Sequence, residues 1–477
     1  MKYLEIFLYG SSLAILAFYV LLQAFYGLLL LTSFHGAWVQ SRRKKLYLPQ
    51  QLATSLTTPP VTILVPAHNE AATIRETVQA LLGLNYPQFE VIVINDGSTD
   101  RTLAELVESF SLRRAEIVFH PFLPTQPIRG VYISLLEPRL TVIDKVGGGK
   151  SDALNAGINL SNTPWACFID ADSILEEDAL LRGMQPAIED QRVVATCGIV
   201  RVANGCRVAA GRVLQVALPR NRLAVFQVVE YLRGFLGGRL GWSWLNGLVI
   251  ISGAFGIFRT DVLRTIGGYS RDTVGEDMEI VFRIHRHFRQ VREPYRVVFV
   301  PDPVCWTQVP SDFSTLRRQR RRWQRGLAEV LAKHRSLFFR PTMGVVGCLA
   351  FPYFVLELLA PVMEISGFVL VPTAWSLGLL RWDYARLYLV LAFLLGVLFA
   401  LWAVVIEEFT YRRYASWYDL FRLLFYALFE HLGYHQMVLW WRLEGTLDYF
   451  RKRQEWGEQV RSGFRRASPV IRPRGAS

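Results

Sequence analysis

The strongest constraint on the fold is an uncharged, apolar run near the N-terminus. No charged residue lies between Ile6 and Phe34, and a helix needs only about 20 apolar residues to cross a bilayer. A cleavable signal peptide is the alternative, but the run is longer than the apolar stretch of such peptides and no small-x-small cleavage site precedes the basic cluster. The sequence therefore predicts a transmembrane helix within residues 1–40.

The charges that flank this run predict its orientation. Only Lys2 precedes it, whereas Arg42, Arg43, Lys44 and Lys45 follow it. Because positive residues accumulate on the cytoplasmic side of membrane segments, we expect the next part of the chain to lie in the cytoplasm, at the inner membrane of the cell.

Residues 48–340 have a different pattern. Short runs rich in β-branched residues (61–66, 89–96, 163–172, 192–200) alternate with helical stretches (71–84, 102–115, 150–160, 176–190). Such alternation is typical of βαβ units on a mostly parallel sheet. We therefore predict an α/β domain over 48–340, with an interfacial amphipathic helix near 313–338.

Apolar segments return after Arg340. Residues 342–372 and 384–406 are long enough to cross a bilayer, and Arg412 and Arg413 follow them. Residues 418–441 contain charged and imidazole side chains, so we expect an interfacial or re-entrant segment there, within a membrane region at 341–445. A basic cytosolic tail is expected at 446–477. The chain is thus predicted to be a multi-pass membrane protein.

Composition narrows the classes of function. Apolar residues make up 52% of the chain and its net charge is +13, which excludes a disordered or collagen-like chain. Five cysteines without a C-x-x-C pair support neither a zinc ribbon nor a disulfide framework, so we expect reduced thiols. Because the basic residues cluster beside apolar segments and not along one groove, no nucleic-acid partner is expected.

Acidic motifs follow the predicted strands. Pro66 to Glu70 ends the first strand and Asn95-Asp96-Gly97-Ser98 ends the second, where a carboxylate can accept hydrogen bonds from a base or a ribose. Asp170 and Asp172 end the third, and such a pair can hold Mg²⁺ or Mn²⁺. A lone D-x-D or N-D-G is also common in ordinary turns.

Three further motifs carry glycine or charge. The run from Gly147 to Lys150 suits a diphosphate, but Asp144 stands where a P-loop has its first glycine. Glu276-Asp277 could act as a general base or as a helix cap. The basic stretch with Gln319, Arg322 and Trp323 suits either a diphosphate beside a sugar or anionic lipid headgroups.

The order of these motifs (N-D-G-S, G-K-x-x-A-L-N, D-A-D, G-A-F-G, G-E-D and Q-R-R-R-W) resembles that of membrane-embedded family 2 glycosyltransferases. Members are cellulose, hyaluronan and chitin synthases, the poly-N-acetylglucosamine synthase of biofilms, and ceramide glucosyltransferase. The resemblance implies a GT-A-like (Rossmann-like) α/β domain flanked by transmembrane helices. It also implies an inverting, metal-dependent hexosyltransferase that uses a nucleotide sugar, with UDP-N-acetylglucosamine or UDP-glucose favoured over GDP-mannose.

The resemblance also implies roles for single residues. The nucleotide sugar would be bound by Asp96 and Lys150, by Asp170 at the ribose, and by a base-pocket wall with Pro66, His68 and Glu70. Asp172 would bind the metal and Asp277 would be the base. The acceptor and the diphosphate would meet Glu276, Gln319, Arg322 and Trp323. Three features depart from the family pattern: His68 in place of Tyr, Gly275 in place of Thr, and an insertion at 119–142.

Three functional classes remain to be weighed. The first is a processive synthase that makes a polysaccharide and moves it across the inner membrane, with an accessory export subunit as a possible partner. The second is a non-processive enzyme with a lipid acceptor, like ceramide glucosyltransferase. An inactive scaffold is the third, but it would have lost its acids, and Asp96, Asp170, Asp172 and Asp277 are all present. The sequence does not select the donor sugar or the linkage.

Overall fold

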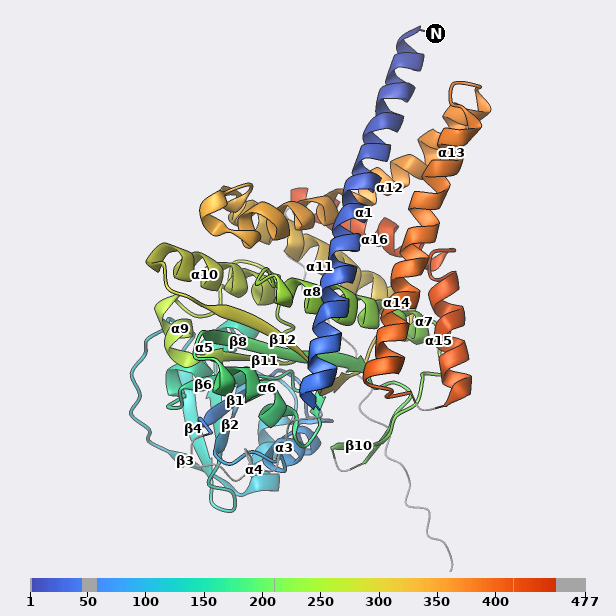
Figure 1. Ribbon diagram of the computed structural model, residues 1–477. Coiled ribbons are helices and arrows are strands. Elements are labelled where there is room, and N and C mark those ends of the chain that lie inside the picture. Colours follow the sequence, from blue (N-terminus) through green and yellow to red (C-terminus); the bar gives the residue numbers. More distant parts are fainter. Residues whose placement is uncertain (1, 45–57, 210, 415, 452–477) are drawn as a thin grey trace, which may run out of the picture.

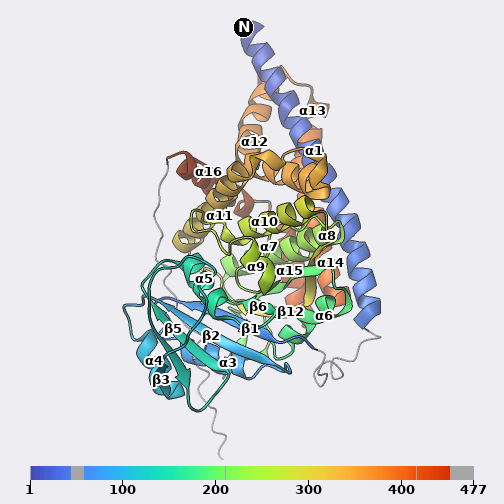
Figure 2. The same cartoon turned by 90° about the vertical axis from the view of Figure 1, so that its left-hand side faces the viewer.

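The computed structural model describes residues 2–44, 58–209, 211–414 and 416–451. Lys45 and most of the basic tail predicted at 446–477 lie outside the described residues. Within the described residues, three helical stretches are long and apolar enough to cross a membrane: Ile6–Gln40, Val346–Ser376 and Trp382–Thr410. The first belongs to α1 (Lys2–Lys44), whose N-terminal end protrudes together with α13 (Trp382–Leu389) and the adjoining end of α12 (Phe351–Ser376) (Figures 1 and 2).

A ten-stranded mixed sheet forms the centre of the remaining chain, in the order β3-β4-β5-β2-β1-β6-β11-β8-β12-β7. Strands β5, β2, β1 and β6 run parallel to one another, whereas β11 runs antiparallel to both its neighbours. The strands are β1 (Val61–Ala67), β2 (Phe89–Asp96), β3 (Leu112–Ala115), β4 (Ile128–Ser134), β5 (Leu140–Lys145), β6 (Trp165–Phe168), β7 (Ile174–Leu175), β8 (Val193–Val202), β11 (Gly256–Arg259) and β12 (Arg296–Thr307). A separate small hairpin consists of β9 (Arg207–Ala209) and β10 (Arg212–Gln215).

The α/β class is confirmed, with two local differences. The helix expected over 102–115 ends at Phe110, because Ser111 adopts the left-handed conformation (φ 49°) and Leu112–Ala115 then pairs with β4 as an edge strand. The insertion at 119–142 contains β4 and the start of β5, and β5 extends the parallel part of the sheet beside β2.

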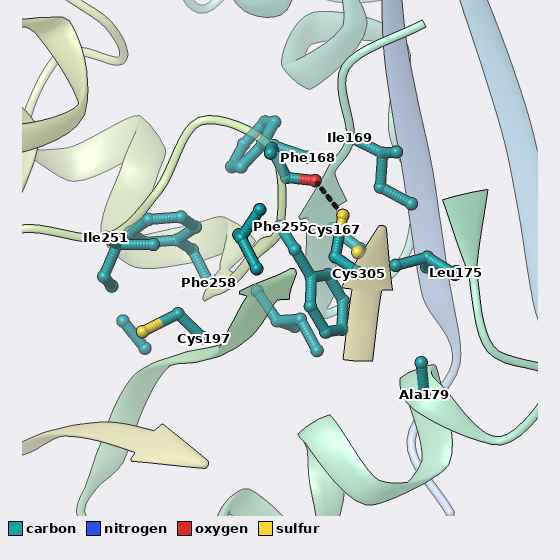
Figure 3. Close-up of a cluster of buried hydrophobic side chains, with 14 of the residues drawn as sticks. Cys167, Phe168, Ile169, Leu175, Ala179, Cys197, Ile251, Phe255, Phe258 and Cys305 are labelled. Carbon is teal, nitrogen blue, oxygen red and sulfur yellow. Dashed lines mark hydrogen bonds between the residues drawn. The ribbon is translucent and has the colours of Figure 1, made fainter. Parts of the chain in front are cut away.

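Helices of the α/β part connect these strands. They are α3 (Ile74–Leu82), α4 (Thr102–Phe110), α5 (Lys150–Leu160), α6 (Ala179–Glu189), α9 (Thr260–Thr265) and α10 (Glu276–Val291). Figure 3 shows a part of the core in which Phe168 of β6 and Phe258 of β11 pack with the thiols of Cys167, Cys197 and Cys305. All five cysteines are free.

A second set of helices covers the sheet on the side of the apolar segments (Figure 1). It contains α7 (Arg222–Leu232), a π-helical turn (Arg233–Arg239), α8 (Leu240–Trp244), α11 (Phe313–Lys333), α12 (Phe351–Ser376), α13 (Trp382–Leu389), α14 (Leu395–Thr410), α15 (Trp417–Phe429) and α16 (Tyr434–Phe450). The stretch 418–441 is divided between α15 and α16, and neither belongs to a candidate membrane span. Helix α16 packs along α11, where Arg317 pairs with Glu444 and Arg321 with Asp448.

Two ion pairs, one of them fully buried, connect the end of α14 to the sheet. The guanidinium group of Arg201 in β8 donates to both carboxylate oxygens of Glu407, at 2.8 and 2.6 Å. Arg413 likewise donates twice to Glu176, which directly follows β7. Each pair is a guanidinium group that donates two hydrogen bonds to one carboxylate. Because this geometry is specific, the pairs fix the position of α14 relative to the strands.

The two carboxylates on α12 also have partners. Glu357 accepts hydrogen bonds from Tyr26 of α1 (2.8 Å) and from Arg442 of α16 (3.1 Å). Glu364 lies 2.9 Å from Nε2 of His435. Both acids therefore face protein, at contacts between α12 and its neighbouring helices.

Candidate active site

The acidic motifs meet at one edge of the sheet. Strands β1, β2 and β6 are parallel and adjacent, so His68, Asp96 and Asp170, which lie at or just beyond their carboxyl ends, share an edge. Ligands of open α/β sheets bind at this edge. The strand order therefore brings the first three motifs of the sequence together.

Asp96 is held by the glycine run. Its carboxylate accepts hydrogen bonds from the amides of Gly148 (2.9 Å) and Gly149 (2.7 Å) and from Nζ of Lys145 (2.6 Å). Gly149, at φ 87°, then begins α5, so that Lys150 is its first helical residue. Asp96 thus positions the glycine run, and any contact with a nucleotide would be made in addition to these bonds.

The stretch from Pro66 to Glu70 is only partly available to a ligand. Pro66 lies within β1, and Nδ1 of His68 is 2.9 Å from the carbonyl oxygen of Asp96. Glu70 is 5% exposed and accepts a hydrogen bond from Thr73, while its amide donates to Thr102. Glu70 therefore stabilises the start of α3 and α4, whereas His68 contacts the backbone of Asp96.

A hollow of about 490 Å³ lies beside the N-D-G-S turn. Asn95, Asp100 and Asp144 line it together with Arg129, which comes from the insertion. The insertion thus contributes a cation to the surroundings of the second motif.

Lys150 is the central cation of the site. Its ammonium group donates to Asp170, and also to the carbonyl oxygen of Gly253 in the G-A-F-G motif at 3.4 Å. A Cβ atom at Gly253 would lie 2.7 Å from Nζ, so the glycine leaves room for this side chain. Burial opposes the charged form of Lys150, but the carboxylates of Asp170, Glu276 and Asp277 raise its pKa.

The remaining acids are close enough for their charges to interact. Burial, followed by the charge of Asp170, raises the pKa of Asp172 to about 7. Burial and the neighbouring Asp277 likewise raise the pKa of Glu276 to about 7. Burial also raises the pKa of Asp277, against the opposing charges of Arg239, Lys150 and Arg322. Carboxyl groups with raised pKa values that face a few cations are typical of catalytic sites.

Helix α11 carries the last motif past the start of α10. The charge of Arg322 acts on both Glu276 and Asp277, so this exposed arginine belongs to the acidic centre. Trp323 is 45% exposed and its ring lies 4.3 Å from the guanidinium group of Arg320. Within the described residues, Oε1 of Gln319 is buried without a hydrogen-bond partner.

Two glycines allow α10 and α11 to approach each other. A Cβ atom at Gly275 would lie 2.9 Å from the carbonyl oxygen of Gly326 and 3.0 Å from Val330. The loop before α10 is also tied to α11, because Glu329 accepts hydrogen bonds from Thr273 and from the amide of Val274. This contact explains the departure at Gly275, since a threonine there would collide with α11.

The Gly275→Ala variant tests this contact. We expect it to lower stability by about 1–3 kcal/mol, because the added methyl group forces the two helices apart. A melting curve of the purified protein measures the change. The control is Gly234→Ala, since a Cβ atom at Gly234 has nothing within 4 Å; equal melting temperatures of both variants would contradict the close contact.

Asp170 and Asp172 have the donor atoms that Mg²⁺ or Mn²⁺ prefers. The raised pKa of Asp172 reports two carboxylates crowded in a poorly hydrated place, which a divalent cation would relieve. Across the described parts of the chain, no group of three His, Cys, Asp or Glu side chains could hold a metal ion by itself. The two carboxylates therefore fit a metal whose other ligands are supplied by water and phosphate.

Several residues of this site were not singled out from the sequence. Lys145 lies between Asp96 and Asp152, at 2.6 and 2.7 Å, and Arg271 approaches Asp152 at 2.9 Å. Arg239 acts on Asp277 from the π-helical turn. Lys145 directly follows Asp144 at the end of an apolar run, which is the usual signal of a strand end. The signal was missed because the preceding residues were interpreted as an insertion.

Comparison with known proteins identifies the family. Residues 62–122 match the model of glycosyl transferase family 2, and residues 136–326 match that of glycosyltransferase like family 2. The chain is 30% identical over 284 residues to the probable glycosyltransferase YdaM of Bacillus subtilis, covering 59% of this chain and 58% of that protein. It is 26% identical over 273 residues to the poly-beta-1,6-N-acetyl-D-glucosamine synthase of Staphylococcus epidermidis, covering 57% and 56%.

A solved structure supports the fold. The mannosyltransferase PcManGT from Pyrobaculum calidifontis, in complex with GDP-Man and Mn²⁺, superimposes with a TM-score of 0.50 at 19% identity, covering 86% of this chain and 99% of that one. The likeness confirms the GT-A-like fold class predicted from the sequence. The alignments span little more than half the length of the curated relatives. Because its two matching segments together cover more than half of its length, the chain belongs to the family 2 glycosyltransferases.

Proposed function

We propose that the protein is a metal-dependent, inverting glycosyltransferase that builds a polysaccharide from a nucleotide sugar at the cytoplasmic face of the inner membrane. The observation that carries the proposal is the single centre formed by Lys150, Asp170 and Asp172 beside Glu276 and Asp277. UDP-N-acetylglucosamine is the first donor to test, because a relative of similar sequence is a poly-N-acetylglucosamine synthase.

The donor would bind along the carboxyl edge of the strands. Lys150 would face its diphosphate together with the start of α5, and Asp96 would keep the glycine run in place. A divalent cation held by Asp170 and Asp172 would supply neutralisation of the diphosphate as it leaves. Arg322, whose charge acts on both Glu276 and Asp277, would add a guanidinium group suited to phosphate oxygens.

Asp277 would accept the proton of the attacking hydroxyl. Its burial keeps the carboxylate poorly hydrated and raises its basicity, while Arg239, Lys150 and Arg322 keep the charged form accessible. With one base and no enzyme nucleophile, the hydroxyl attacks opposite the leaving diphosphate, and the anomeric configuration is inverted. Trp323, half exposed on α11, would stack on the acceptor sugar.

A donor panel with purified protein tests the proposal. UDP-N-acetylglucosamine, UDP-glucose and GDP-mannose, each radiolabelled, are supplied with Mg²⁺ or Mn²⁺, and the product is sized. A long polymer from one donor is the expected result. Transfer of a single sugar, with the label extracted into organic solvent, would replace polymer synthesis by glycosylation of a lipid, and no transfer from any donor would contradict the activity.

The carboxylates at the start of α10 predict the pH dependence of the reaction. Burial raises the pKa of Glu276 to about 7, and burial also raises the pKa of Asp277 above its ordinary value. The ionised form of each acid is therefore present above its own pKa and is lost as the pH falls through it. We expect kcat/KM to fall by about tenfold per pH unit on the acidic side of neutrality. Initial rates measured against pH, with donor binding followed in parallel, check this; a flat profile down to pH values near 5 would argue against these acids.

A further inference from the structure

A second charged cavity lies away from the acidic centre. It is a hollow of about 750 Å³ between the end of α10, the start of β12 and the loop before α12. Five arginines line it, and we call it the arginine pocket: Arg192, Arg289, Arg292, Arg296 and Arg340. Asp277 is the second residue of α10 and Arg289 lies near its end, so about 18 Å of helix separates the two sites.

The positive charge of the arginine pocket is only partly compensated. Arg192 and Arg296 share one carboxylate, that of Asp190, at 2.8 and 3.7 Å. Arg289, Arg292 and Arg340 have no carboxylate partner within the described residues, although Glu293 also lines the pocket. In the same part of the chain, Nε of Arg289 is buried without a hydrogen-bond partner. A buried donor left unpaired is costly, and the arginines without a carboxylate partner leave an excess of positive charge that an anion in the pocket would neutralise.

The electrostatics of α10 explain only part of this cluster. Arginines near a helix C-terminus interact favourably with the helix dipole, which accounts for Arg289 and Arg292. Arg192 precedes β8, Arg296 begins β12 and Arg340 precedes the loop to α12, so three separate segments bring their guanidinium groups to the same hollow. Guanidinium groups bind phosphate oxygens in a planar, two-pronged geometry.

The pocket lies where the chain enters a candidate membrane span. Arg340 precedes the span Val346–Ser376 by six residues, and Gly344, between them, lies against Nη2 of Arg289. Phe338 and Phe339, just before Arg340, are 46% and 62% exposed. Exposed aromatic side chains beside arginines are typical of the headgroup region of a bilayer.

We propose that the arginine pocket binds the phosphate of an anionic phospholipid headgroup from the adjoining leaflet. The same chemistry would accept a free phosphate, but the position at the entry to a span favours the lipid. The site is separate from the acidic centre, so lipid binding can be measured without any glycosyl transfer.

Native mass spectrometry of the full-length protein in detergent tests the proposal, with phosphatidylglycerol and phosphatidylcholine as probes. We expect phosphatidylglycerol to bind about tenfold more tightly than phosphatidylcholine, and Arg289→Gln combined with Arg340→Gln to remove this preference. The matched control is Arg286→Gln, an exposed arginine on α10 outside the pocket, which should keep the preference. If the double variant fails to fold, the single variant Arg340→Gln, at an exposed residue, should still weaken the preference for phosphatidylglycerol.

Two results would overturn the assignment. A preference for phosphatidylglycerol that survives the double variant would exclude the pocket as the site. Equal affinity for both lipids, with inorganic phosphate protecting the protein against heating only when Arg289 and Arg340 are intact, would make the ligand a free phosphate and exclude the lipid.

Discussion

Replacing Asp277 by asparagine is expected to lower kcat by about 100- to 10,000-fold, the range supplied by a positioned general base. Asparagine keeps the size of the side chain and its contact with the amide of Met278, but it cannot take a proton from an acceptor hydroxyl. Donor affinity should remain nearly unchanged, because the base acts on the acceptor. Turnover and nucleotide-sugar binding, measured on the same preparation, check both expectations.

Stability separates this catalytic role from a structural one. Burial raises the pKa of Asp277, which means that the ionised carboxylate is disfavoured in the folded protein. Its neutral replacement should therefore melt at the same temperature as the parent or higher. Asparagine caps a helix about as well as aspartate, so the contact with the amide of Met278 is kept in either case. A fold that depended on the charge of Asp277 would instead lose stability together with turnover.

Two neighbouring acids provide the controls. Asp272 lies in the loop before α10, and its exposed carboxylate pairs with Lys333 of α11. The Asp272→Asn variant removes this carboxylate and should leave turnover intact. Glu276→Gln changes the adjacent acid on the same turn. If Glu276→Gln abolished turnover while Asp277→Asn kept it, the base would be Glu276 and the family motif would have been read one residue out of register.

The strand-end acids could be predicted because apolar runs mark strands and the carboxyl ends of parallel strands coincide. This reasoning led to Asp96 and Asp170, and the structure places both at the same edge of the sheet. The candidate membrane spans were likewise visible as apolar runs, and they lie within a few residues of 6–34, 342–372 and 384–406.

Contacts between distant segments could not be predicted in this way. Lys145 and Asp96 are 49 residues apart, and Arg271 and Asp152 are 119 apart, so no local pattern relates them. Glu70 lies in a motif and was predicted to form the wall of a base pocket. In the structure its carboxylate accepts a hydrogen bond from the hydroxyl of Thr73. A motif identifies which residues are special, whereas only the fold decides whether their side chains face a ligand or each other.

The contact between α11 and α16 is a second example. The basic stretch of α11 was expected to meet a diphosphate or lipid headgroups, but Arg317 and Arg321 face Glu444 and Asp448 of α16. Arg322 and Trp323, on the exposed side of the helix, remain available for a ligand. Successive residues of a helix point in different directions. The basic run can therefore contact α16 on one face and a ligand on another.

Replacing Lys145 by methionine is expected to destabilise the protein by about 3–5 kcal/mol, the usual cost of removing one partner from a buried ion pair. The Lys145 and Asp152 side chains are both 0% exposed, and the ammonium group lies 2.7 Å from Asp152 and 2.6 Å from Asp96. Without it, two buried carboxylates lose their shared cation. The amides of the glycine run donate hydrogen bonds to Asp96, so the run would be less well positioned. We therefore also expect weaker donor binding.

The pH dependence of that loss has a definite sign. In the parent protein burial opposes ionisation of Asp152, but Lys145, Arg271 and the amide of Gln126 together lower its pKa, so its contribution to stability is present above the unfolded pKa and is lost as the pH falls. In the Lys145→Met variant Asp152 keeps Arg271 but loses Lys145, so its carboxylate becomes easier to protonate. Its deficit in melting temperature should therefore shrink from pH 8 towards pH 5.

A second substitution completes the test. Adding Asp152→Asn to Lys145→Met removes one of the uncompensated charges, and it should recover part of the lost stability, whereas Asp152→Asn alone should destabilise because Lys145 and Arg271 then lose a partner. The four melting temperatures form a double-mutant cycle with a coupling free energy well above zero. Additive effects would mean that Lys145 acts only by filling space, and Asp96 would then hold the glycine run through its two amide hydrogen bonds alone.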